Sequence, residues 1–230
     1  MLIDLHITRW FPGILLIATG LIATGFAQGA DLSVAVKTDK GQPLAEAVIT
    51  AVPVNDIYPE QLVAAARNTI EIMDQINKEF VPFIKPILVG TSVSFPNKDN
   101  IRHHVYSFSP AKRFELPLYA GTPAQPVLFD KPGVVALGCN IHDWMIGYIY
   151  VSETPWFTQT DSGGNATLSS LAPGQYRVRV WHPDAATPQE DTIKEITIAN
   201  DNVASSWVLK VKKREIRSRR APLPGPGGYR

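Results

Sequence analysis

Apolar and polar residues alternate in short stretches along most of the chain, and turn-forming residues close each stretch. Segments such as TSVSF at 91–95 and QYRVRVW at 175–181 place every second side chain on one face, as a half-buried strand requires. The candidate strands are residues 32–36, 47–52, 87–89, 91–95, 103–108, 112–118, 126–129, 134–139, 146–152, 165–169, 175–181, 193–198 and 205–211. The pattern predicts an all-β fold, an antiparallel sandwich or barrel.

One region departs from this rhythm between residues 57 and 86. Residues 57–67 (IYPEQLVAAAR) are the best helix candidate, and residues 68–76 fit either a strand or a weak helical stripe. The alternation favours the strand, and Pro82 and Pro86 break any helix beyond it.

The first 29 residues have the order of a secretory signal peptide. Arg9 precedes an apolar run at 11–26, and small residues follow in GFAQGAD. The run is short for a spanning helix, and an uncleaved anchor is the alternative. Both interpretations place the folded part outside the cytoplasm, so we expect a periplasmic or otherwise exported protein.

Composition and charge narrow the class further. The chain has 230 residues, 45% of them hydrophobic, and a formal net charge of +1. A core can form, and the charge balance argues against a nucleic-acid partner. Residues 212–230 are Pro-, Gly- and Arg-rich, which predicts a disordered basic tail. We expect membrane contact only through an uncleaved signal or this tail.

One cluster of residue types carries chemistry. Cys139, His142 and Met145 follow one another as Cys-x2-His-x2-Met, and His103-His104 lie on an upstream strand. Residues 140–145 read as a tight loop that folds three side chains onto one point. Two imidazoles, one thiolate and a weak axial thioether are the ligands of a blue-copper electron-transfer site. Because these ligands leave no position for a substrate, they indicate a carrier of electrons and not an enzyme.

The same residues resemble those of the cupredoxins. The loop is similar to that of amicyanin, and the upstream run Phe80-x-Pro82, Gly90-x-x-Val93-x-Phe95, Asn97-x-Asp99 and then His103 is similar to plastocyanin-type sequences. More narrowly, the chain resembles exported methylamine-utilisation-type proteins. The resemblance spans about residues 68–152 and implies a Greek-key sandwich, one type 1 copper and transient redox protein partners.

The choice between His103 and His104 stays open at this point. Alignment with the cupredoxin His-Asn-Val favours His103 as the ligand and gives His104 a supporting position beside it. Side-chain alternation puts His104, Tyr106 and Phe108 on the more apolar face, which keeps His104 as an alternative ligand. Trp144, next to His142, is the candidate docking residue for a partner.

A second resemblance covers the flanking segments. Thr160 to Gly164 and Leu171 to Tyr176 resemble a carboxypeptidase-regulatory-like β-sandwich module, and Gly41 to Leu44 with Ala47-Val48 resemble the opening of that module. The predicted organisation is a signal peptide at 1–29, a cupredoxin-like sandwich at 31–211 with regulatory-like strands at 31–55 and 158–211, and the tail. This module implies no enzyme activity.

Two functions therefore compete. The first is a periplasmic blue-copper protein that carries single electrons and has no small-molecule substrate. The second is a non-redox exported sandwich that stores or delivers copper, or binds carbohydrate or protein. A zinc site built from the same residues is a third and weaker hypothesis, because zinc prefers harder ligands than a thioether.

Overall fold

The computed structural model describes residues 29–55, 64, 69–123, 125–188 and 190–212. Within them the chain is built from strands, with one 3-10 helix, η1 (Glu190–Thr192). The expected signal peptide except Gly29, all of the helix at 57–67 except Ala64, and all of the basic tail except Lys212 lie outside the described residues. No helix in the described part of the chain has the length and apolar character needed to span a lipid bilayer.

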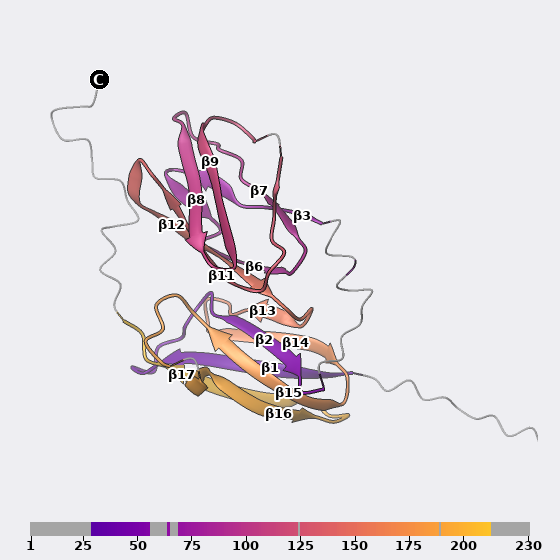
Figure 1. The fold of residues 1–230 in the computed structure, drawn as a ribbon. Coiled ribbons are helices and arrows are strands. Elements are labelled where there is room, and N and C mark those ends of the chain that lie inside the picture. The colour runs from indigo at the N-terminus through magenta and orange to yellow at the C-terminus, as the bar shows by residue number, and fades with distance from the viewer. Residues whose placement is uncertain (1–28, 56–63, 65–68, 124, 189, 213–230) are drawn as a thin grey trace, which may run out of the picture.

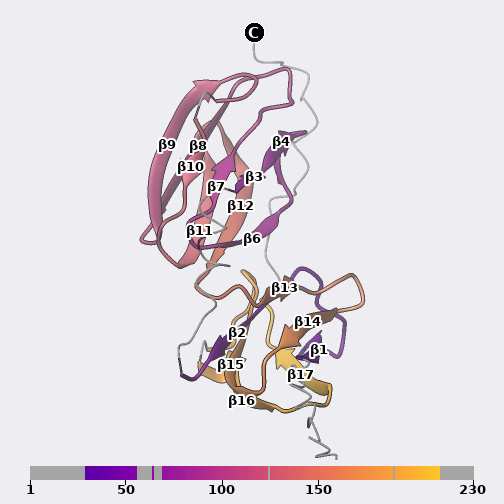
Figure 2. The ribbon, with the colours of Figure 1, turned by 90° about the vertical axis from the view of Figure 1, so that its right-hand side faces the viewer.

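The strands fall into two groups, which we name the site lobe and the flanking lobe (Figure 1). The chain leaves the flanking lobe after its second strand, builds the site lobe, and then returns to finish the flanking lobe (Figure 2). The flanking strands are β1 (Ala30–Thr38), β2 (Val48–Pro53), β13 (Phe157–Gln159), β14 (Asn165–Leu171), β15 (Gly174–Trp181), β16 (Ile193–Ile198) and β17 (Val203–Leu209).

The flanking lobe packs a three-stranded sheet, β14-β1-β17, against a four-stranded sheet, β13-β2-β15-β16. Alternation in β1 buries Leu32, Val34 and Val36 almost completely, and they join one apolar cluster with Trp207. The first strand and the last strand pair in parallel, with Leu32 opposite Val203. This pairing joins the first and last strands of the flanking lobe, so the segment that forms the site lobe is an insertion between β2 and β13.

The site lobe contains a five-stranded sheet, β6-β12-β11-β8-β9, a three-stranded sheet, β10-β7-β3, and the pair β4-β5. Its core includes Phe95, Phe129 and Leu137, all at most 1% exposed. Its strands are β3 (Ile70–Ile72), β4 (Asp74–Ile76), β5 (Glu79–Val81), β6 (Ile84–Leu88), β7 (Ser92–Ser94), β8 (His103–Ser109), β9 (Lys112–Tyr119), β10 (Val127–Leu128), β11 (Gly133–Cys139) and β12 (His142–Ser152).

The structure confirms the all-β prediction but corrects some boundaries. The expected loop at 140–145 is a turn at Asn140 and Ile141, because β12 already begins at His142 and not at residue 146. Strands β5 and β13 were not expected, and β6 is longer than expected and contains Pro86. Because β6 is an edge strand, a proline without an N–H is tolerated there.

Candidate metal centre

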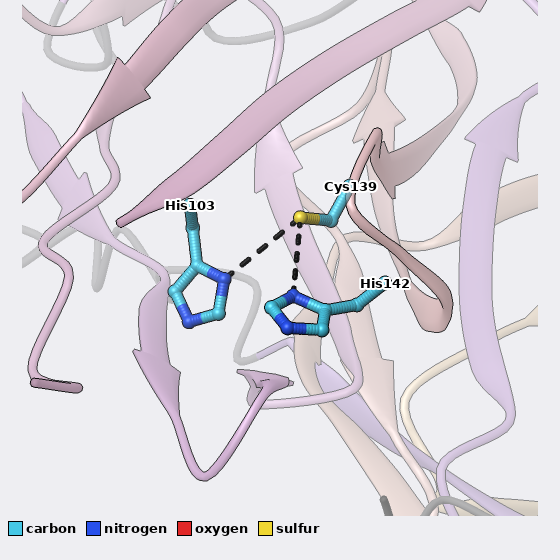
Figure 3. Close-up of side chains that lie close together, drawn as sticks. All are labelled: His103, Cys139 and His142. Atoms are coloured by element: carbon cyan, nitrogen blue, oxygen red, sulfur yellow. Dashed lines mark hydrogen bonds between the residues drawn. The ribbon is translucent and has the colours of Figure 1, made fainter. Parts of the chain in front are cut away.

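Three strand ends bring His103, Cys139 and His142 together. His103 begins β8, Cys139 ends β11 and His142 begins β12, and these three strands are neighbours in one sheet. A register shift between Gly138 and Cys139 sets Cys139 opposite His142 across the turn. Figure 3 shows the three side chains converging, with both imidazoles turned toward the sulfur.

The distances fit donors that share one metal ion. Cys139 Sγ lies 3.8 Å from His103 Nδ1 and 3.6 Å from His142 Nδ1. Metal–nitrogen and metal–sulfur bonds of about 2.0 and 2.3 Å, held about 120° apart, separate the two donors by about 3.7 Å. The ligand atoms of all three residues lie within 4.8 Å of one another. The residues therefore fit a trigonal metal site with two nitrogen donors and one sulfur donor.

Met145 lies close to this group in the fold. Its side chain is 2% exposed and belongs to the same apolar cluster as Cys139. Both residues line one surface hollow together with Tyr106 and Gly138. The structure therefore buries Met145, the residue that the sequence predicts as axial ligand, in the same apolar cluster as Cys139.

Asp99 fixes the orientation of His103. The Nε2–H of His103 donates to Asp99 Oδ2 at 2.7 Å, which leaves the Nδ1 lone pair facing Cys139. Asp99 also accepts the backbone N–H groups of Asn77 and Lys78, at 2.6 and 2.8 Å. Burial alone raises the pKa of Asp99, but the hydrogen bonds from His103, Lys78 and Asn77 outweigh it, so the net pKa is lowered. The carboxylate therefore stays ionised.

His142 stays neutral more readily than an exposed histidine. Burial lowers its pKa, and electrostatic interactions with His103 and Lys78 lower it further, against the opposing effect of Asp99. A neutral imidazole keeps the lone pair that a metal requires. His142 is only half-buried, so one edge of the site reaches the surface.

His104 points elsewhere, although the sequence kept it as an alternative ligand. Its Nε2 lies 3.0 Å from Glu115 Oε1, and its ring packs beside Tyr106. The apolar composition of this face of β8 was misleading, because Phe108 on the same face is 74% exposed. The buried face carries His103, Val105 and Ser107 instead.

Trp144 is less exposed than the sequence suggested. Its ring centroid lies 5.2 Å from that of His142, and its Nε1 is buried without a hydrogen-bond partner. The apolar side chains that reach solvent near the site are Ile141 and Ile146, 49% and 38% exposed. Sequence reasoning missed both, although their places beside His142 and Met145 were a usable signal.

A hydrogen-bonded polar pair, buried Gln75 and half-buried Tyr119, lies beside His103 in the site lobe. Tyr119 pairs with His103 across β8 and β9, and its hydroxyl donates to the Phe95 carbonyl at 2.6 Å. Gln75 Nε2 donates to the Tyr119 oxygen at 2.5 Å. Burial raises the pKa of Tyr119 to about 12, although the hydrogen bond from Gln75 acts in the opposite direction. The hydroxyl is therefore a fixed donor, and no sequence motif pointed to it.

Comparisons with known proteins return structural neighbours only. No protein-family model matches the chain, and no curated protein matches it. Similar solved structures include a copper-containing nitrite reductase from Thermus scotoductus (28% identity, TM-score 0.34, covering 36% of this chain and 22% of that one). A purple cupredoxin from Nitrosopumilus maritimus has 25% identity and a TM-score of 0.32, covering 37% and 100%. An amicyanin variant has 16% identity and a TM-score of 0.33, covering 46% and 99%.

Proposed function

We propose that this chain is an exported type 1 copper protein that carries single electrons between redox partners. The observation that carries the proposal is the convergence of His103 Nδ1, Cys139 Sγ and His142 Nδ1 within 4.8 Å. Soft thiolate and imidazole donors together favour copper over harder cations. Bound in this site, one copper ion would supply a one-electron redox couple.

The protein residues have distinct parts in this proposal. Cys139 would supply the thiolate, His103 and His142 would supply the nitrogens, and Met145 would supply a weak thioether donor that tunes the potential. Asp99 holds the tautomer of His103, and the strand ends fix all three donors before metal binds. A rigid donor set changes little between oxidation states, which suits fast electron transfer. With every protein position used, we assign the chain as a carrier and not as an enzyme.

We assign electron exit to the half-buried edge of His142. Ile141 and Ile146 expose apolar surface close to this edge, and Trp144 packs against the His142 ring. A small apolar patch of this kind suits the low-area, short-lived encounters of redox proteins. The partner we propose is another redox protein, with contact through these residues.

We further propose roles for the segments outside the site lobe. Residues 1–29 are a signal peptide, residues 212–230 are a basic tail, and the flanking strands form a regulatory-like module whose role is structural. The bond from Tyr176 Oη to the Ala172 carbonyl, 2.9 Å long, fixes a corner of that module.

Reversible electron cycling tests this function directly. The full chain, loaded with Cu(II), is reduced with ascorbate and reoxidised with ferricyanide while the visible spectrum is recorded. We expect the charge-transfer band to disappear and return over many cycles, with one electron per chain and no loss of copper. Release of copper on reduction would instead support storage or delivery. Cys139→Ser serves as the control without the band.

A further inference from the structure

A second hollow lies at the junction of the two lobes, away from the metal centre. It has a volume of about 390 Å³ and is lined by residues of both lobes. The site lobe contributes Val134, Tyr148 and Tyr150, and the flanking lobe contributes Arg179 and Trp181. Junctions between structural units are frequent places for small-molecule sites, and this volume suits a molecule with a single ring.

Arg179 gives the hollow its charge. Within the described part of the chain its guanidinium has no ion pair or hydrogen bond, and no acidic residue lines the hollow. Arg179 lies on β15 between Thr50 of β2 and Ile193 of β16, so its backbone is held on both sides. A half-buried guanidinium without a partner favours an anion, and its planar donors match a carboxylate in two parallel hydrogen bonds.

Aromatic side chains supply the second recognition element. The Trp181 ring centroid lies 5.8 Å from that of Tyr148 and 5.4 Å from that of Tyr150. These rings meet at angles of 64° and 47°, so they form an angled apolar wall and not a flat stack. A flat ring packs well against such a wall. The neighbouring His182 and Thr192 add polar groups to the same hollow.

We propose that this hollow binds a small aromatic carboxylate, with its carboxylate on Arg179 and its ring against Trp181, Tyr148 and Tyr150. The ligand contacts both lobes, because Arg179 and Trp181 belong to the flanking lobe and the two tyrosines belong to the site lobe. Binding therefore stabilises the whole chain against unfolding, in proportion to ligand concentration. The site does not involve the metal ligands.

The test uses benzoate as the probe and benzamide as its uncharged isostere, measured by isothermal titration calorimetry on the full chain. We expect saturable binding of benzoate with a Kd of about 1 mM or tighter. Benzamide binds at least about tenfold more weakly, because it cannot form the charged pair.

Two arginine variants separate the proposal from unspecific binding. Arg179→Gln lowers benzoate affinity about tenfold or more, and Arg179→Lys, which keeps the charge, loses less. Arg177→Gln is the matched control, because Arg177 lies two positions away on β15, is exposed and does not line the hollow. It leaves the affinity unchanged. Circular dichroism checks that each variant is folded.

Specific outcomes of these titrations would reject the proposed anion site. Absence of saturable benzoate binding at ten times that concentration, or equal affinity in wild type and Arg179→Gln, rejects the site. Equal binding of benzamide rejects the carboxylate as the recognised group. The same titration with Cys139→Ser is expected to give the wild-type affinity, so failure of the copper proposal and failure of this one are distinguishable.

Discussion

Asp99 connects the proposed ligand His103 to the turn between β4 and β5. It is a single carboxylate with three donors: the His103 ring and two backbone N–H groups. A carboxylate on the far nitrogen makes the imidazole a stronger electron donor and prevents its rotation. At the residue scale, the site is therefore defined by the side chains that orient the donors as well as by the donors themselves.

Asp99→Asn keeps the shape of this side chain and removes its charge. We expect copper affinity to fall about tenfold, the lower end of the range for such supporting residues. The reduction potential rises, because the lost negative charge had stabilised the more oxidised ion. Competition with a chelator measures the affinity, and spectroelectrochemistry measures the potential. Asp130→Asn, which removes an exposed partner of Lys112, is the control, and a wild-type affinity and potential in Asp99→Asn would contradict this role.

At the element scale, two glycines of the β11–β12 hairpin, Gly138 and Gly147, lie against neighbouring side chains that leave little space for a Cβ. A Cβ added at Gly147 meets Phe80 Cβ at 2.7 Å and Met73 Cε at 3.0 Å, and both neighbours are buried. A Cβ added at Gly138 meets the ring end of Tyr106 at 2.8 Å, and this ring is only half-buried. A Cβ added at either glycine meets a neighbour at a similar distance, but the two neighbours differ in how deeply they are buried.

Gly147→Ala is therefore expected to lower the free energy of unfolding by about 1–3 kcal/mol. Gly138→Ala, its matched control, is expected to cost less, since Tyr106 is only half-buried. Urea denaturation followed by circular dichroism measures both. Equal losses in the two variants would show that the burial of the neighbour does not matter here.

Tyr119 makes the stability of the site lobe decrease as the pH rises in the alkaline range. Its pKa is raised to about 12 in the folded chain, above the usual value near 10. A raised tyrosine pKa means that its contribution is fully present below about pH 10 and is lost as the pH rises toward 12. Unfolding curves between these pH values should show this loss, and Tyr119→Phe should reduce it. An unchanged slope in the variant would contradict the assignment.

The sequence predicted elements well where alternation alone decides, as in β11, where Val135, Leu137 and Cys139 are buried in turn. It failed where tertiary structure decides. The early start of β12 depends on a register shift in its hairpin, and the parallel pairing of β1 with β17 joins residues far apart in the chain. The spacing of Cys139 and His142 along the chain indicated a shared metal site. The hydrogen bond between His103 and Asp99, in contrast, could be found only in the folded structure.

At the scale of the whole molecule, the two lobes meet through a small apolar cluster. Val48 and Trp181 of the flanking lobe pack there with Ile84 and Tyr150 of the site lobe. Gln159 Nε2 also donates to the Ile84 carbonyl at 3.2 Å. The contact orients the lobes while leaving the metal centre within the site lobe.

Trp181→Ala removes the largest side chain of this contact. We expect a loss of about 1–3 kcal/mol in the free energy of unfolding, less than for a fully buried aromatic. The copper spectrum should not change, because the donors belong to the other lobe. Calorimetry and visible absorption measure the two effects. Phe108→Ala, at an exposed aromatic, is the control, and a disturbed copper spectrum in Trp181→Ala would show that the lobes are coupled.

In the proposed copper site, His103, Cys139 and His142 together bind one copper ion. Titration of the full chain with Cu(II), followed by visible absorption, tests this binding most directly. We expect an intense thiolate-to-copper band that saturates at one ion per chain. Folded His103→Gln, Cys139→Ser and His142→Gln variants lose this band, while His104→Gln keeps it. A band that persists in Cys139→Ser, or that depends on His104 and not on His103, would rule out this copper site.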